Sequence, residues 1–281
     1  MKKIFSTVVL ICAALAAMAQ VRVATPNIEL ILNAEPGQEL QIAYFGGRLA
    51  DGDLANLQAA GAPNHNAYPP YGFNCPSEAS LAVTHMDGNM STVLKVESVS
   101  QADEPSAKVT RIRLKDTVYP LYVTVCYRAY QDVDMIETWT EIENLEKKPV
   151  TLTRFDSGYL PIRVGDVWVS HLYGTWANEG RLAQEPLERG MMTIKNKDGV
   201  RNAHTDHAEV MFSLDGKPQE NAGRVIGAAL CYSGNYELRI DTRDTDYHQF
   251  FAGINPDKTQ KTAGCNPRLM QEEKRKGKMK Y

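Results

Sequence analysis

The stretch Leu121-Tyr122-Val123-Thr124-Val125-Cys126-Tyr127-Arg128 places an apolar side chain at every second position. The apolar side is formed by Leu121, Val123, Val125 and Tyr127, and the opposite side includes Thr124, Cys126 and Arg128. Successive side chains of a β-strand point to opposite faces, so this alternation predicts a strand with one face against a core.

Similar β-rich runs recur between Val21 and Ile254, and turn-forming sequences such as Glu35-Pro36-Gly37 separate them. The predicted strands are Ile28–Leu32, Leu40–Phe45, Val93–Val99, Lys108–Lys115, Leu121–Tyr130, Met135–Asn144, Val150–Ser157, Asp166–Leu172, Ala208–Leu214, Arg224–Tyr232, Tyr236–Asp241 and His248–Ile254. Only short helical segments, such as Asp53–Ala60, are expected among them. The pattern predicts an all-β fold with antiparallel sheets packed face to face in one large β-sandwich.

The composition is that of an ordinary globular protein. The chain has 281 residues, 43% of them hydrophobic and 23% charged, with a formal net charge of −3. These proportions exclude a wholly disordered or collagen-like chain. No apolar run reaches the ~18–20 residues that cross a bilayer, so no membrane span is expected. The near-neutral charge gives no basis for a general nucleic-acid binder.

The first nineteen residues have the pattern of a signal peptide. Lys2 and Lys3 precede the mostly apolar stretch Ile4–Ala17, and Ala17-Met18-Ala19 fits a small-x-small cleavage site. A buried N-terminal helix is the alternative, but nothing caps the segment. We therefore expect an exported protein, periplasmic or extracellular, whose folded domain covers residues 20–257.

The cysteines of the exported part do not have metal or redox spacing. Cys75, Cys126, Cys231 and Cys265 allow three pairings if all are bridged, and none forms a C-x-x-C motif. Cys126 and Cys231 lie in strand-like runs, where a free cysteine packs as a small hydrophobe. Because a large core does not need disulfides, free thiols are expected.

The last 24 residues, 258–281, differ from the rest of the chain. They carry a charge of +6, whereas residues 1–257 carry −9, and they show no strand alternation. This composition predicts a basic tail that is disordered or read out of frame, so that the product is truncated. A basic arm for an anionic partner is the alternative, and it fits poorly with an exported, acidic body.

His204-Thr205-Asp206-His207-Ala208-Glu209 contains the residue types of a metal site. Two histidines three residues apart share a face of a helix, but this segment runs into a predicted strand, where they point to opposite faces. A polar loop or strand entry is therefore expected, with no metal and no cofactor. His171, His204 and Glu209 are also the residue types that act as acid and base in a sugar mutarotase.

Two aromatic segments are candidates for sugar binding. Tyr68-Pro69-Pro70-Tyr71-Gly72-Phe73 is a stiff aromatic loop, and Leu172-Tyr173-Gly174-Thr175-Trp176 places aromatic rings beside a glycine. Trp139 and Trp168 lie in strand runs and are expected in the core, whereas Trp176 lies in a predicted loop. The sequence contains no G-x-S-x-G, P-loop or G-x-G-x-x-G motif.

Several blocks in a fixed order resemble the N-terminal domain of glycoside hydrolase family 36 α-galactosidases. They are Tyr68-Pro69-Pro70-Tyr71-Gly72, Met86-Asp87-Gly88, Trp139-Thr140-Glu141-Ile142-Glu143-Asn144, Val169–Glu179 with Gln184–Gly190, and Leu230–Tyr236 through Gly253-Ile254-Asn255-Pro256. The resemblance spans Ile28 to Asp257. It implies a large antiparallel two-sheet β-supersandwich.

The resemblance also implies where the chemistry takes place. The family's retaining reaction uses an aspartate nucleophile and an aspartate acid/base in a (β/α)₈ barrel that follows this domain, so no catalytic residue is expected here. It further implies an α-galactoside as partner and a homo-oligomer formed through the N-terminal domain. Asp53, Tyr71 and Trp176 are the expected sugar contacts. Phe73-Asn74-Cys75 stands where the family often has an Asp-Phe-Arg step, so that arginine is missing.

The sequence thus predicts the N-terminal domain of an exported α-galactosidase-like hydrolase, catalytically incomplete without its barrel. Two alternatives from other classes stay open. One is a standalone galactoside-binding module, suggested by the Tyr71 and Trp176 loops. The other is a sugar mutarotase.

Overall fold

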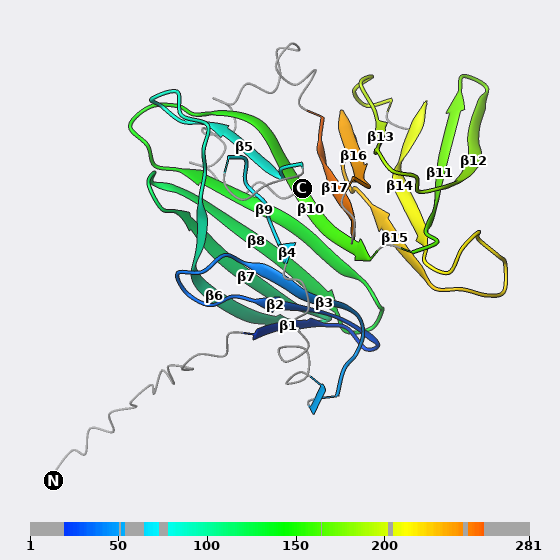
Figure 1. Ribbon diagram of the computed structural model, residues 1–281, viewed down its shortest axis with the longest axis horizontal. Helices are drawn as coiled ribbons and strands as arrows, with labels where there is room; N and C mark the ends of the chain where they lie inside the picture. The colour runs from blue at the N-terminus through cyan, green and yellow to red at the C-terminus, as the bar shows by residue number, and fades with distance from the viewer. Residues whose placement is uncertain are drawn as a thin grey trace, which may run out of the picture.

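The protein is all-β, as its sequence predicts (Figure 1). The computed structural model describes residues 20–50, 52–53, 65–72, 78–163, 165–201, 205–243 and 247–255. Its strands are β1 (Gln20–Ala24), β2 (Ile28–Asn33), β3 (Gln41–Gly47), β4 (His65–Asn66), β5 (Leu81–Thr84), β6 (Leu94–Glu104), β7 (Ala107–Asp116), β8 (Leu121–Tyr130), β9 (Ile136–Asn144), β10 (Thr151–Arg163), β11 (Trp168–Thr175), β12 (Asn178–Pro186), β13 (Met191–Lys195), β14 (Asp206–Ser213), β15 (Val225–Ala229), β16 (Tyr236–Asp241) and β17 (Tyr247–Ile254).

The predicted signal peptide, residues 1–19, and the predicted basic tail, residues 258–281, lie outside the described residues. No helix in the described ranges is long and apolar enough to cross a membrane.

Hydrogen bonding divides the strands among four sheets, whereas the sequence predicts two. The sheet orders are β1-β2-β3-β4, β6-β7-β8-β9, β12-β11-β14-β15 and β13-β16-β17-β10-β5. Every pairing between these strands is antiparallel. Strands bend at bulges and change partners there, so large twisted sheets split into smaller ones. Such register shifts interrupt the pairings of β10 with both of its neighbours.

The sheets enclose two hydrophobic cores. Sheets β1-β2-β3-β4 and β6-β7-β8-β9, together with β5 and the first part of β10, bury the first core. The apolar face of β8 that the sequence predicts lies there, with Leu121, Val123 and Val125 at most 2% exposed. Sheet β12-β11-β14-β15 packs against β13, β16 and β17 around the second core.

The opposite face of β8 carries a small apolar cluster of its own. Cys126 packs there with Val109 and Trp139, and all three are buried. The guanidinium groups of Arg111 and Arg128 lie 5.9 and 5.2 Å from the Trp139 ring centroid, so cations cover this cluster. Trp139 is thus buried as predicted, whereas Trp168 is only half-buried. Neither cysteine within the described ranges, Cys126 or Cys231, forms a disulfide there.

Strand β10 belongs to both cores. Its first residues pair with β5 as far as Phe155, and from Asp156 to Arg163 it pairs with β17. A bulge between Asp156 and Gly158 marks the exchange. Opposite the bulge stands Gly253, and a Cβ at this position would lie 2.6 Å from a carboxylate oxygen of Asp156. A glycine is required here because the two backbones approach so closely.

A buried ion pair lies at this exchange point. The guanidinium of Arg239 on β16 contacts the carboxylate of Asp156, and the two side chains are 2% and 4% exposed. Arg239 also donates to Glu78 Oε2 at 2.9 Å. The carbonyl oxygen of Asp156 accepts hydrogen bonds from the Tyr68 hydroxyl at 3.1 Å and from Thr140 Oγ1 at 3.2 Å. One short segment of β10 is therefore tied to β16, to β9 and to the aromatic loop before β5.

We expect Asp156→Asn to lower the free energy of unfolding by about 3 kcal/mol, because it leaves the buried charge of Arg239 without its closest partner. The double variant Asp156→Asn/Arg239→Met should lose less than the sum of the two single variants, since it removes both charges. Urea unfolding of all four proteins measures this coupling. Strict additivity would show that the pair does not act as a unit.

Candidate functional site

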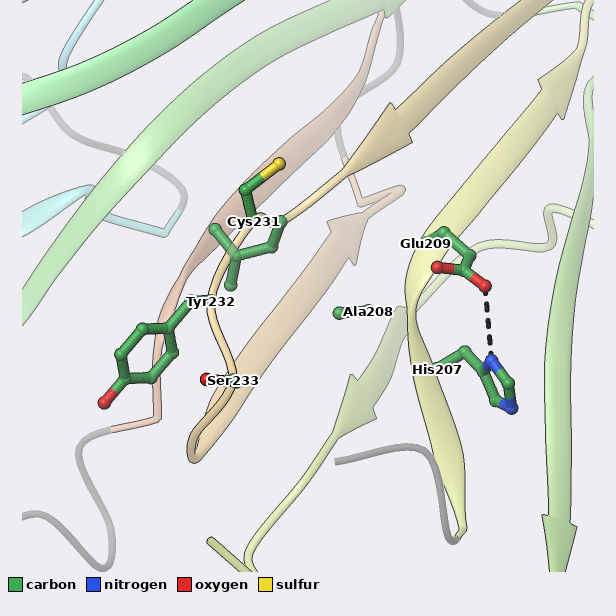
Figure 2. Close-up of a pocket in the computed structure, with 7 residues that line it drawn as sticks. His207, Ala208, Glu209, Cys231, Tyr232 and Ser233 are labelled. Atoms are coloured by element: carbon green, nitrogen blue, oxygen red, sulfur yellow. Dashed lines mark hydrogen bonds and ion pairs between the residues drawn. The ribbon is translucent and has the colours of Figure 1, made fainter. Parts of the chain in front are cut away.

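A pocket of about 370 Å³ opens at the end of sheet β12-β11-β14-β15 (Figure 2). One wall is formed by the start of β14, and the other by the segment that follows β15. The lining residues are His207, Ala208, Glu209, Leu230, Cys231, Tyr232 and Ser233. Polar groups of several kinds therefore face a space large enough for a small polar ligand.

His207 and Glu209 form the acid–base pair of the pocket. They are two residues apart on β14 and so share a face of the strand, which brings His207 Nδ1 to 3.2 Å from Glu209 Oε1. The two side chains are 20% and 52% exposed. His207 Nε2 is buried and has no hydrogen-bond partner among the described residues. A histidine held by a carboxylate at one nitrogen can exchange a proton at the other.

The surroundings of this pair hold a second carboxyl group. Burial raises the pKa of Asp206, and the neighbouring His171 and His207 partly oppose this effect. The carbonyl oxygen of Asp206 accepts a hydrogen bond from the Tyr236 hydroxyl at 2.7 Å. Burial, with a smaller effect of the Asp206 charge, raises the pKa of that hydroxyl. The Tyr236 hydroxyl on β16 of the facing sheet therefore holds the first residue of β14 in place, next to the pocket.

The structure brings together only part of the predicted acid–base set. Glu209 lines the pocket, but its partner is His207. His171 lies on β11 opposite Val210 and contacts Glu185 Oε1 through Nε2 at 3.4 Å, whereas His204 lies outside the described residues. The predicted strand Ala208–Leu214 begins after His207, so sequence reasoning missed the His207–Glu209 pair; the spacing of two residues becomes a signal only with β14 extended back to Asp206.

The predicted absence of a metal site concerns clusters of ligand side chains, and the described ranges contain none. No three His, Cys, Asp or Glu side chains gather there in a way that could hold a metal ion.

Figure 2 shows Cys231 and Tyr232 across the pocket from His207 and Glu209.

The three predicted sugar contacts lie in different parts of the fold. Asp53 is exposed, and its amide donates to the Ala50 carbonyl at 2.9 Å. Tyr71, in the turn before β5, is 49% exposed, and Trp176, in the β11–β12 hairpin, is 81% exposed. None of them lines the pocket, and no hydrogen bond or ring contact joins them to one another in the described structure. Each is an accessible side chain on its own loop.

The Tyr71 turn rests on a buried polar group that sequence reasoning missed. Tyr71 accepts a hydrogen bond from the Thr92 amide at 3.1 Å, and Thr92 Oγ1 lies 3.1 Å from His85 Nε2. The other ring nitrogen of His85 lies 2.8 Å from Glu146 Oε1, and both side chains are almost fully buried. The His85 ring stacks on Tyr119 with centroids 3.7 Å apart. These long-range contacts have no local sequence signal.

The β11–β12 hairpin holds its exposed ring on a strained turn. Ala177, next to Trp176, has φ = 59°, the left-handed region that side chains other than glycine rarely adopt. Glu179 Oε1 accepts a hydrogen bond from the Ala177 amide at 3.0 Å. Gly174 lets the two strands approach, since a Cβ there would lie 2.6 Å from the Glu179 Cα.

Comparisons with known proteins point to one family. The model of the glycosyl hydrolase family 36 N-terminal domain matches residues 38–262. Alpha-galactosidase AgaA of Geobacillus stearothermophilus is 28% identical over 154 residues, which are 54% of this chain and 21% of that protein. Alpha-galactosidase Mel36A of Lactobacillus acidophilus is 25% identical over 153 residues, again 54% of this chain and 21% of that protein.

Solved structures show the same fold. The crystal structure of AgaA superposes with a TM-score of 0.75 at 21% identity, over 84% of this chain and 37% of that one. An AgaA variant in complex with raffinose gives a TM-score of 0.77 at 20% identity, over 85% of this chain and 38% of that one. The chain spans about a fifth of the length of these curated relatives and under two fifths of the solved chains.

We expect Ala177→Gly to raise the free energy of unfolding by about 1 kcal/mol, because glycine adopts a left-handed conformation without the steric cost that alanine has. Thermal unfolding should show a midpoint about 2–4 °C higher. Ala229→Gly, at an exposed position of β15, is the matched control and should be neutral or destabilising. A loss of stability in Ala177→Gly would contradict the assigned strain.

Proposed function

This chain belongs to the glycosyl hydrolase family 36 N-terminal domain family, and we propose that it is the N-terminal β-domain of an exported α-galactosidase-like hydrolase acting on α-galactosides. The family match, which covers most of the β-fold, is the observation that carries the proposal. The relatives named above are α-galactosidases, and one solved relative holds raffinose. Export rests on the signal-peptide pattern of residues 1–19.

The proposed arrangement of layers is the two-sheet β-supersandwich that the family resemblance implies. The two cores support it, because each is enclosed between facing sheets and β10 runs through both. In this interpretation the four hydrogen-bonded sheets are the segments of two bent layers.

The proposed role of this domain is sugar contact rather than bond cleavage. A retaining glycosidase needs two carboxyl groups about 5–5.5 Å apart on either side of the scissile bond. The family resemblance assigns that pair to a (β/α)₈ barrel, and barrels take about 250 residues. More than three fifths of each solved relative lies outside the match with this chain. We assign Asp53, Tyr71 and Trp176 to contact with an α-galactoside, and we propose that the domain self-associates.

We expect raffinose to bind the 281-residue chain with measurable heat at millimolar concentration, and no nitrophenol to be released from nitrophenyl α-galactoside. Tyr71→Ala and Trp176→Ala should each reduce the heat of binding, because each removes the exposed ring on its own loop that can stack on a sugar face. Val118→Ala, which truncates a side chain that is 75% exposed, is the control. No heat with the unaltered chain would refute sugar contact.

Calorimetry also separates the two roles in which the domain binds sugar. A standalone galactoside-binding module should bind raffinose as tightly as a longer hydrolase that contains this domain. A domain that completes a hydrolase site should bind less tightly alone.

The His207–Glu209 pair favours one other function, a sugar mutarotase. The pair lies in a polar pocket, as an acid and base for ring opening must. Under this alternative the chain accelerates the anomerisation of galactose measured by polarimetry, and Glu209→Gln lowers that rate about 100-fold. Glu185→Gln, which alters the carboxylate beside His171, should have no effect. An unchanged anomerisation rate in the presence of the unaltered chain eliminates this function.

A further inference from the structure

Strand β12 is an exposed edge of sheet β12-β11-β14-β15 (Figure 1). Its nine residues pair only with β11 in the described structure, and all but Ala183 are exposed. The strand contains no lysine, and its one proline is the final residue, Pro186. Edge strands of this length are normally protected by charge, proline or a covering segment, because their free backbone groups can pair with another chain.

The backbone hydrogen bonds of β11 show which groups of β12 face outward. Gly174 donates to the carbonyl of Thr205, so even-numbered residues of β11 bond toward β14. Leu187 donates to Val167, so the odd-numbered residues bond toward β12. In an antiparallel pair both backbone groups of a residue point to the same side, and neighbours alternate. Leu182 and Gln184 therefore present their amide and carbonyl groups to the free edge, whereas Gly180, with φ = 72°, lies where the register of β11 and β12 shifts.

The charges of β12 favour one partner strand, which is β12 itself. We propose that this edge pairs antiparallel with the same edge of a second copy, about a two-fold axis at Ala183. Leu182 then exchanges backbone hydrogen bonds with Gln184 of the second copy. Arg181 stands directly opposite Glu185 of the second copy, and the symmetry repeats this pair. Both belong to positions that are not hydrogen-bonded across the edge, where opposed side chains lie closest.

Neighbouring registers of the same edge lack this match. The register that places Leu182 opposite itself brings Arg181 opposite Ala183, so Arg181 has no carboxylate opposite it. The register that places Gly180 opposite Leu182 brings Arg181 opposite itself. Like charges directly opposite each other destabilise a strand pair, so the pairing centred on Ala183 is selected by charge.

The groups involved are available in the single chain. Leu182 is 59% exposed, and in the chosen register the two copies of Leu182 become diagonal neighbours on one face. Arg181 forms no ion pair in the described structure and lies 5.9 Å from the Tyr173 ring centroid. The Glu185 side chain is 54% exposed and contacts His171 at 3.4 Å. Pairing with a second copy would give hydrogen-bond partners to the outward-facing amide and carbonyl groups of β12. It would also bury part of the exposed Leu182, Arg181 and Glu185 side chains.

This dimer rests on the self-association included in the proposed function, and it assigns that self-association to the free edge of β12. Sedimentation velocity of the full chain over a range of micromolar concentrations measures the dimer. Arg181→Glu and Glu185→Arg should each weaken dimerisation about tenfold or more, because each places like charges opposite each other twice. The double variant Arg181→Glu/Glu185→Arg restores opposite charges and should return to within about threefold of the unaltered chain.

Lys147→Glu, at an exposed position near the first core, is the charge control and should leave dimerisation unchanged. Thermal unfolding of each variant confirms that the domain is folded. If the chain dimerises but none of the β12 variants affects it, self-association uses another surface and the β12 assignment is wrong. If the unaltered chain is monomeric at every concentration, both the assignment and the proposed self-association fail.

Discussion

The contact between the Arg239 guanidinium and the Asp156 carboxylate is the constraint on which the rest of the structure depends. Removing two charges from water costs several kcal/mol each, and only close pairing with further hydrogen bonds offsets that cost. Arg239 contacts Asp156, Glu78 and the carbonyl of Ala79, while burial raises the pKa of Asp156 well above its ordinary value, so the cost of desolvation at this carboxyl group is large. The contact lies where β10 leaves β5 and joins β17, at the bulge between Asp156 and Gly158.

This geometry also places the accessible loops. The carbonyl of Asp156 holds the Tyr68 hydroxyl, and Tyr68 belongs to the same aromatic loop as Tyr71. The turn that carries Tyr71 is held from the other side by Thr92, which the buried His85–Glu146 pair supports. Side chains suited to binding are thus exposed on loops, while the groups that support them are buried.

Much of the fold could be predicted from the sequence, because alternation reports burial directly. Strand β8 has one face in the first core, whereas β16 and β17 are buried along almost their whole length, and the sequence predicts all three. Strand β12 was missed, since Asn178–Pro186 has both faces exposed and shows no apolar period. The four-sheet arrangement was missed because a bulge such as that between Asp156 and Gly158 depends on contacts with strands distant in sequence. At the site, Glu209 was found, but its pairing with His207 follows only once the segment is known to be a strand.

Hydrogen exchange followed residue by residue through a denaturant series tests most directly whether the two cores form one unit. The account predicts that protected amides of β8 in the first core and of β14 in the second exchange through the same opening, with the same free energy and denaturant dependence. Amides of β10 and β17 should belong to that unit as well. If β11, β14 and β15 exchange through a separate opening of clearly lower free energy, the two cores unfold independently, and the Arg239–Asp156 contact does not hold them together.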